Sequence, residues 1–138
     1  MSLIRSRYTR SQNQEVVGKQ VEFVPNLNLK AGTQGGYGPV KASVQLTYLS
    51  DQFSEATNAE NSPRDARPDP TAAVIGLIPA YQVLDASVSW ERRWLKLEGS
   101  VNNLANTRYF TRRATGYPGP GILPSDGRSV YLTVAVKW

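Results

Sequence analysis

The sequence has neither cysteine nor histidine among its 138 residues. A chain without cysteine forms no disulfide and offers no thiolate metal site. A chain without histidine lacks the commonest general base, the commonest metal ligand and any Ser-His-Asp triad. No apolar run approaches about 18 residues, the length that a transmembrane helix needs. The composition therefore argues against a classical hydrolase and against a membrane protein built from helices.

The chain is modestly basic, with a formal net charge of +5. Such a balance suits nucleic acid, anionic lipid or an anionic ligand, and it equally suits a solvated surface. The arginines are scattered and the aromatic residues form no groove pattern, so we expect no nucleic-acid partner. The acidic residues between positions 51 and 69 lack the Asp-x-Asp-x-Asp-Gly spacing of a calcium loop. We therefore expect no metal site and no cofactor.

The last nine residues alternate strictly between apolar and other side chains. The apolar positions are Val130, Leu132, Val134, Val136 and Trp138. A period of two predicts a β-strand with one apolar face. Similar alternation predicts strands over residues 3–9, 21–34, 39–50, 81–91, 94–103 and 128–138. Most of them are about 9–11 residues long, the length that crosses a bilayer at a tilt.

The links between these strands are short and long in turn. Residues 34–39 and 91–94 are tight turns, whereas residues 10–20, 51–80 and 104–127 are long and polar. Outer-membrane barrels have short periplasmic turns and long extracellular loops, so this rhythm predicts a barrel whose C-terminal end is periplasmic. We expect an all-β fold, an antiparallel up-and-down meander of about six strands that forms a segment of a transmembrane β-barrel.

Polar residues lie opposite the apolar positions of the predicted strands. They include Lys41, Gln45, Asp85, Glu98 and Asn102. In a barrel they line a wet lumen, whereas in a soluble sandwich they face solvent while the apolar faces pack sheet on sheet. The alternative to a receptor barrel is therefore a soluble β-sandwich or small barrel that binds a ligand through residues 51–80 and 104–127.

Four segments resemble the TonB-dependent outer-membrane receptors. Val101-Asn-Asn-Leu-Ala-Asn-Thr-Arg-Tyr109 resembles the Asn-Leu-Phe-Asp-x-x-Tyr signature near the end of that family, and Gly127-Arg128 follows before a final strand. Residues 18–29 are similar to a segment that enters a barrel strand, and residues 48–53 to a strand end before an extracellular loop. Two positions differ from the family: Ala105 replaces its usual Phe, and the chain ends in Trp138 rather than Phe.

The resemblance implies that residues 1–138 are the C-terminal part of a receptor barrel in the bacterial outer membrane. In that family, the barrel imports a scarce ligand such as a ferric siderophore and surrounds an N-terminal plug. We expect the plug, the TonB box and the earlier strands to be absent from this chain, so that TonB is a partner only through the missing part. We also expect contact with outer-membrane lipid, no enzymatic activity, and oligomerisation of the isolated piece through its open strand edges.

The third long link is locally basic, and aromatic residues are interleaved with its arginines. We expect Arg108, Tyr109, Arg112, Arg113 and Tyr117 to help capture an anionic ligand such as a ferric chelate. A solvated loop, or contact with lipid phosphates, would also explain them.

Several other polar residues have a structural or a catalytic interpretation. Asn102, Asn103 and Asn106 are expected to shape the bend from strand to loop, because Asn tolerates left-handed conformations. Asp85 and Glu98 could face each other across the lumen, where a polar network is a better interpretation than catalysis.

The final strand has two expected roles. In a receptor it closes the barrel, and its aromatic end resembles the signal that the outer-membrane assembly machinery recognises. We assign both roles to Val134, Val136 and Trp138. With Trp90 and Trp94, which flank the second tight turn, Trp138 would form an aromatic girdle at the periplasmic side.

Overall fold

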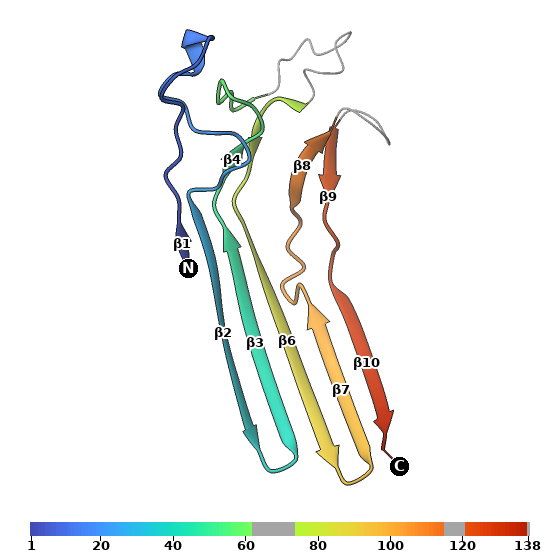
Figure 1. The fold of residues 1–138 in the computed structure, drawn as a ribbon. Coiled ribbons are helices and arrows are strands. Elements are labelled where there is room, and N and C mark those ends of the chain that lie inside the picture. Colours follow the sequence, from blue (N-terminus) through green and yellow to red (C-terminus); the bar gives the residue numbers. More distant parts are fainter. Residues whose placement is uncertain (62–73, 115–120, 138) are drawn as a thin grey trace.

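The computed structural model describes residues 1–61, 74–114 and 121–137. Six antiparallel strands form the main sheet, in the order β1-β2-β3-β6-β7-β10 (Figure 1). Their bounds are β1 Ser2–Leu3, β2 Leu27–Tyr37, β3 Val40–Leu49, β6 Tyr81–Arg92, β7 Leu95–Asn102 and β10 Ser129–Val136. The order of the strands in the sheet follows their order in the sequence, so the predicted all-β meander is confirmed. Among the described residues, no helix has the length and apolarity to cross a membrane.

Two small sheets and one short helix lie beyond the end of the main sheet that is opposite the tight turns (Figure 1). One sheet pairs β4 (Gln52–Phe53) with β5 (Leu77–Ile78), and the other pairs β8 (Phe110–Ala114) with β9 (Gly121–Pro124). The 3-10 helix η1 (Gln14–Val16) lies in the first long link. The second and third of the three long links thus each contain a pair of strands that the sequence does not predict.

The tight turns each contain two residues between paired strand ends. Tyr37 pairs with Val40 across Gly38 and Pro39, and Arg92 pairs with Leu95 across Arg93 and Trp94. The first residue of each turn has a positive φ, 56° at Gly38 and 50° at Arg93. Glycine adopts this conformation without steric cost, whereas arginine does so only under strain.

One face of the main sheet is apolar over five neighbouring strands. The register aligns Val44 with Ala86, Val88 with Gly99, and Gly99 with Leu132, and so places the predicted apolar positions side by side. No second sheet of the described chain covers this face. Leu132 is 79% exposed and Val88 is 52% exposed, while Val16 and Ile78 are the buried apolar side chains of the described residues. An uncovered apolar face of this size suits contact with lipid, and it does not fit the alternative of a soluble sandwich.

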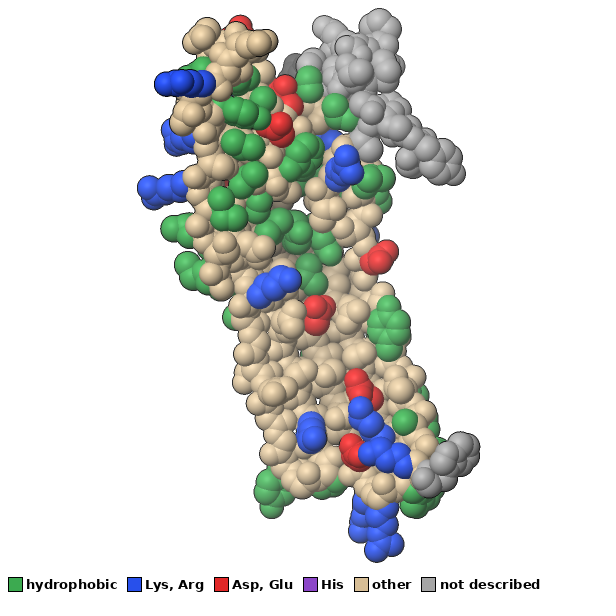
Figure 2. Space-filling view, viewed as in Figure 1, with side chains coloured by type: hydrophobic (Ala, Val, Ile, Leu, Met, Phe, Trp, Pro, Cys, Tyr) green, Lys and Arg blue, Asp and Glu red, His purple; other side chains and the backbone are tan. Residues whose placement is uncertain are grey.

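The opposite face is polar, as the sequence predicts. Lys41 pairs with Ser89, Ser89 with Glu98, and Gln45 with Asp85. Figure 2 shows charged side chains gathered near the tight turns, while the middle of the sheet carries mostly small or uncharged polar groups. The pairs Lys96–Glu98, at 2.7 Å, and Lys137–Glu91 account for much of the charge at that end.

Strand ends differ from the sequence prediction at the start of the chain. Residues 3–9 do not form a continuous strand, because β1 ends at Leu3 and is followed by an isolated bridge between Arg7 and Gln20. Strand β2 begins at Leu27 rather than at residue 21, and Phe23 has a φ of 56° that interrupts the extended chain. The alternation in this region therefore correctly predicts which side chains of β2 lie on each face of the sheet, but it overestimates the length of the strand.

The two faces of β3 provide a direct test of the lipid contact. We expect Val44→Lys, on the apolar face, to destabilise the folded protein in a bilayer by about 2–4 kcal/mol, because lysine near the bilayer midplane is poorly solvated. Gln45→Lys, one residue further along on the polar face, should change little. Urea unfolding in phospholipid vesicles measures both, and equal losses for the two variants would contradict the assignment of the faces.

Candidate functional site

The amide of Asn103 closes the end of strand β7. Its Nδ2 donates to the carbonyl oxygens of Thr107, at 2.9 Å, and Asp126, at 3.3 Å, while its Oδ1 accepts from the N–H of Thr107 at 2.8 Å. The N–H of Asn103 donates to Asp85 Oδ1 at 2.8 Å, and the residue is only 3% exposed. With φ values of 52° at Asn103 and 53° at Asn106, the predicted role in the bend is confirmed for these two asparagines, whereas Asn102 is the last residue of β7 and pairs with Ser129.

The two C-terminal motifs of the sequence meet at this bend. Asn106 Oδ1 accepts from the N–H of Arg128 at 3.1 Å, and a Cβ added to Gly127 would lie 3.3 Å from the same oxygen. A larger residue at position 127 would therefore crowd the amide that holds the start of β10. The Asn-Leu-Ala-Asn and Gly-Arg segments thus form one structural unit, although about 20 residues separate them.

The two N-terminal motifs meet in the same way at the start of β2. Leu27 donates its N–H to Ser50 Oγ at 3.1 Å, and the N–H of Ser50 donates to the carbonyl of Leu27 at 2.9 Å. Nearby, the N–H of Phe23 donates to the carbonyl of Phe53 at 2.8 Å. Both pairs of motifs therefore lie where a long link leaves the main sheet.

Arg113 connects the second and third long links. Its Nη2 donates to the carbonyl of Leu77 at 3.2 Å, and its guanidinium lies 5.4 Å from the centre of the Phe110 ring. A Cβ added to Gly76 would lie 3.1 Å from the same Nη2, and Gly76 has a φ of 139°, so glycine suits this close approach. Arg113 is therefore engaged within the protein and positions the two links relative to each other.

Two of the other predicted ligand residues, Arg108 and Tyr109, line a hollow at the base of β8 and β9, whereas Arg112 is not among its lining residues. Its volume is about 500 Å³, and it is lined by Arg108, Tyr109, Phe110, Ile122 and Pro124 among others. The Tyr109 ring stacks on Tyr81 of β6, with 4.3 Å between the ring centres. Arg108 and Arg112 are exposed, and no salt bridge found in the described residues includes either. Tyr117 lies outside the described residues.

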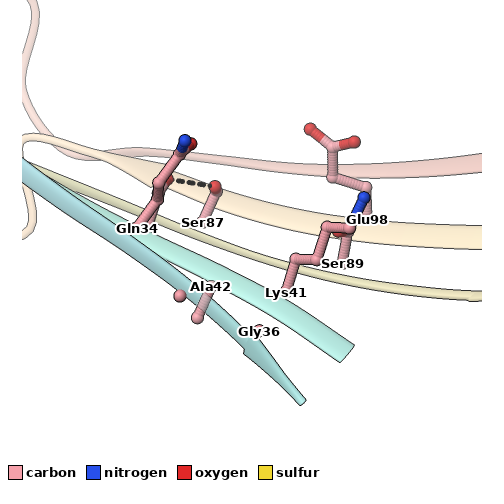
Figure 3. A pocket seen from close by; sticks show the side chains of 9 residues that line it. Gln34, Gly36, Lys41, Ala42, Ser87, Ser89 and Glu98 are labelled. Atoms are coloured by element: carbon pink, nitrogen blue, oxygen red, sulfur yellow. Dashed lines mark hydrogen bonds between the residues drawn. The ribbon is translucent and has the colours of Figure 1, made fainter. Parts of the chain in front are cut away.

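A second hollow lies on the polar face of the main sheet, near the tight turns (Figure 3). Lys41 and Glu98 flank it, and Ser43 and Ser87 share a hydrogen bond of 2.8 Å within it. Its residues were expected in the lumen but not as a hollow, because a row of small side chains has no distinctive sequence signal.

The expected pairing of Asp85 with Glu98 is wrong. Both residues lie on the polar face of paired strands, but Glu98 is opposite Ser89, four residues along β6 from Asp85. Asp85 instead accepts the N–H of Asn103, and Glu98 pairs with Lys96.

The residues assigned to barrel closure lie on the free edge of the sheet. Val134 is opposite Leu97 and Val136 is opposite Leu95, and both are more than half exposed on the apolar face. Trp138 lies outside the described residues. Trp94 is exposed in the second turn, and Trp90 is half-buried beside Leu97.

We expect Asn103→Ala to loosen the bend at the end of β7. The change removes three side-chain hydrogen bonds and places alanine at a positive φ, so the free energy of unfolding should fall by about 2–4 kcal/mol. Asn102→Ala, at the exposed neighbouring position, should lower it by less than about 1 kcal/mol. Denaturant unfolding measures both effects, and an unchanged midpoint for Asn103→Ala would show that this amide does not hold the bend.

Comparisons with known proteins agree with this geometry. A family model described as TonB dependent receptor-like, beta-barrel, matches residues 1–104. No curated protein sequence matches the chain.

Solved structures of receptors share the fold. The ferric citrate transporter FecA in its unliganded form superposes with a TM-score of 0.74 and 22% identity, covering 90% of this chain and 18% of its own. The siderophore receptor PiuA from Acinetobacter baumannii gives 0.68 and 22%, covering 89% and 15%. The ferric-catecholate import receptor Fiu from E. coli K12 gives 0.65 and 19%, covering 86% and 15%. The chain thus spans less than a fifth of each of these receptors. It belongs to the β-barrel family of TonB-dependent receptors, which are outer-membrane proteins of bacteria.

Proposed function

We propose that the chain forms part of the wall and the outer loops of a receptor that takes up a ferric siderophore or a similar scarce anionic ligand. The observation that carries this proposal is the exposed guanidinium group of Arg108 at the hollow that Tyr109 and Phe110 line, with the exposed Arg112 two residues beyond Phe110 on β8. The names of the matched structures, which describe ferric citrate, siderophore and ferric-catecholate import, support a ligand of this class.

The proposed chemistry is capture rather than catalysis. Guanidinium groups bind carboxylate or catecholate oxygens through paired N–H donors, and aromatic faces cover the carbon skeleton of a chelate. Arg113 positions this surface, because it already bonds Leu77 and lies over Phe110. Transport would further require TonB and a plug, and no residue of the chain is assigned to either contact.

The ligand proposal is tested with ferric chelates of different charge. In outer-membrane preparations, we expect Arg108→Gln/Arg112→Gln to weaken binding of radiolabelled ferric citrate or ferric catecholate about 10- to 100-fold, since each lost charged hydrogen bond costs about 1.5 kcal/mol or more. The matched control is Arg92→Gln/Arg93→Gln, which removes the same charge at the tight-turn end. Equal weakening by both variants, or unchanged binding in the first, would contradict the proposal.

We also propose that both edges of the main sheet pair with further strands. The outer edge of β10 has no partner in the described chain, and β1 covers only two residues of β2. Unpaired backbone groups are costly in lipid and promote strand addition. The isolated 138-residue chain should therefore migrate as an oligomer in size-exclusion chromatography in detergent, whereas a monodisperse monomer would refute this.

A further inference from the structure

The first long link forms a hairpin that continues the edge of the main sheet. Beyond β1, the N–H of Ile4 donates to the carbonyl of Asn26 at 2.9 Å, and that of Tyr8 to the carbonyl of Lys19 at 3.0 Å. Gly18 returns a bond of 2.8 Å to the carbonyl of Tyr8. Residues 4–8 are thus held beside residues 18–26, on the side of the sheet edge that lies away from the tight turns (Figure 1).

Arg5 and Arg7 share a hollow with Leu3 beside this hairpin. Leu3 pairs with Leu27, which shares its face with Leu29 and the other apolar positions. The hollow has a volume of about 600 Å³, and Ser6, Gln20 and Asn26 line it as well.

The hollow has fixed polar walls and no neutralising carboxylate. Asn26 Nδ2 donates to Gln20 Oε1 at 3.3 Å, and Gln20 Nε2 donates to the carbonyl of Val24 at 2.6 Å. None of the salt bridges in the described part of the chain includes Arg5 or Arg7. The carboxylate of Glu22 is engaged by the Tyr8 hydroxyl, and this hydrogen bond raises the pKa of Tyr8. Basic side chains line the corresponding edge in Figure 2.

The length of β2 sets the height of the hollow relative to a bilayer. This strand contains 11 residues, from Leu27 to Tyr37. At about 3.4 Å per residue and a tilt of about 45°, they span about 25 Å, which is the height of the apolar band of such barrels. Residues beyond Leu27, and with them Arg5 and Arg7, therefore lie at the level of the lipid headgroups.

We propose that Arg5 and Arg7 form a binding site for the phosphate group of an anionic lipid in the leaflet at the loop end of the sheet. Two guanidinium groups in one hollow can bind the oxygens of a phosphate through several N–H donors. The lipid chains would then continue along the apolar face below Leu3. This site lies at the β1 edge of the sheet and does not depend on the ligand proposed above.

The test uses the protein isolated from outer membranes in a nonionic detergent. We expect fluorescent phosphatidic acid in mixed micelles to bind, and phosphatidylcholine to bind much more weakly. Arg5→Gln/Arg7→Gln should weaken phosphatidic acid binding about tenfold or more, and Arg5→Lys/Arg7→Lys should retain part of it, because the charge remains. Lys30→Gln/Lys41→Gln, with the same loss of charge on the polar face, should bind as the unaltered protein does.

Three outcomes would overturn the inference. One is equal weakening by the Arg5/Arg7 and Lys30/Lys41 variants, which would indicate a general charge effect. Another is unchanged binding in Arg5→Gln/Arg7→Gln. The third is competition by glycerol 3-phosphate at concentrations equal to those of the lipid, which would make the ligand a free phosphate rather than a membrane lipid. Ferric chelate binding should be unaffected by the Arg5/Arg7 change, so this inference and the receptor proposal can fail separately.

Discussion

The structure depends on an unbroken ladder of backbone hydrogen bonds. Strands β2, β3, β6, β7 and β10 pair in sequence, and the described residues supply almost no buried apolar core beside them. In water such a sheet would be held by backbone pairing alone, which contributes little net free energy. In lipid the same bonds are essential, because unpaired N–H and C=O groups find no water to bond. The sheet is therefore suited to a bilayer in a way that its modest hydropathy does not reveal.

The register of this ladder determines both faces, and it is fixed from both ends. At one end, two-residue turns leave no freedom in which residues pair. At the other end, Asn103 and Asn106 tie the end of β7 to the start of β10, and Ser50 ties β3 to β2. A slip of one residue would exchange the apolar and polar faces, so these polar contacts protect the lipid-facing surface without touching it.

Much of this architecture could be predicted from the sequence because alternation is a local signal. The alternation of side chains from Val130 to Val136, or from Val40 to Tyr48, indicates which face of the sheet each one occupies. The glycines before Pro39 indicate a turn. The strand pairs β4–β5 and β8–β9 could not be predicted in the same way, because they are too short to alternate, and β4 and β5 also lie far apart in the chain. The partner of Asp85 was missed for a similar reason: a carboxylate that accepts a backbone N–H leaves no periodic pattern. The Asn residues at the bend were predictable because their type alone indicates a positive φ.

The contact of Arg113 with Gly76 and Leu77 has a consequence for how such proteins diverge. The small sheets share no backbone ladder with the membrane wall, so changes in them need not disturb the register of the wall. The two small sheets are nevertheless joined to each other, because a bulkier residue at position 76 would displace the guanidinium. Mutations that alter one outer link would then be tolerated best when the other changes with it. In evolution, and in attempts to graft new recognition sequences onto this scaffold, the two links would therefore have to be changed or exchanged together.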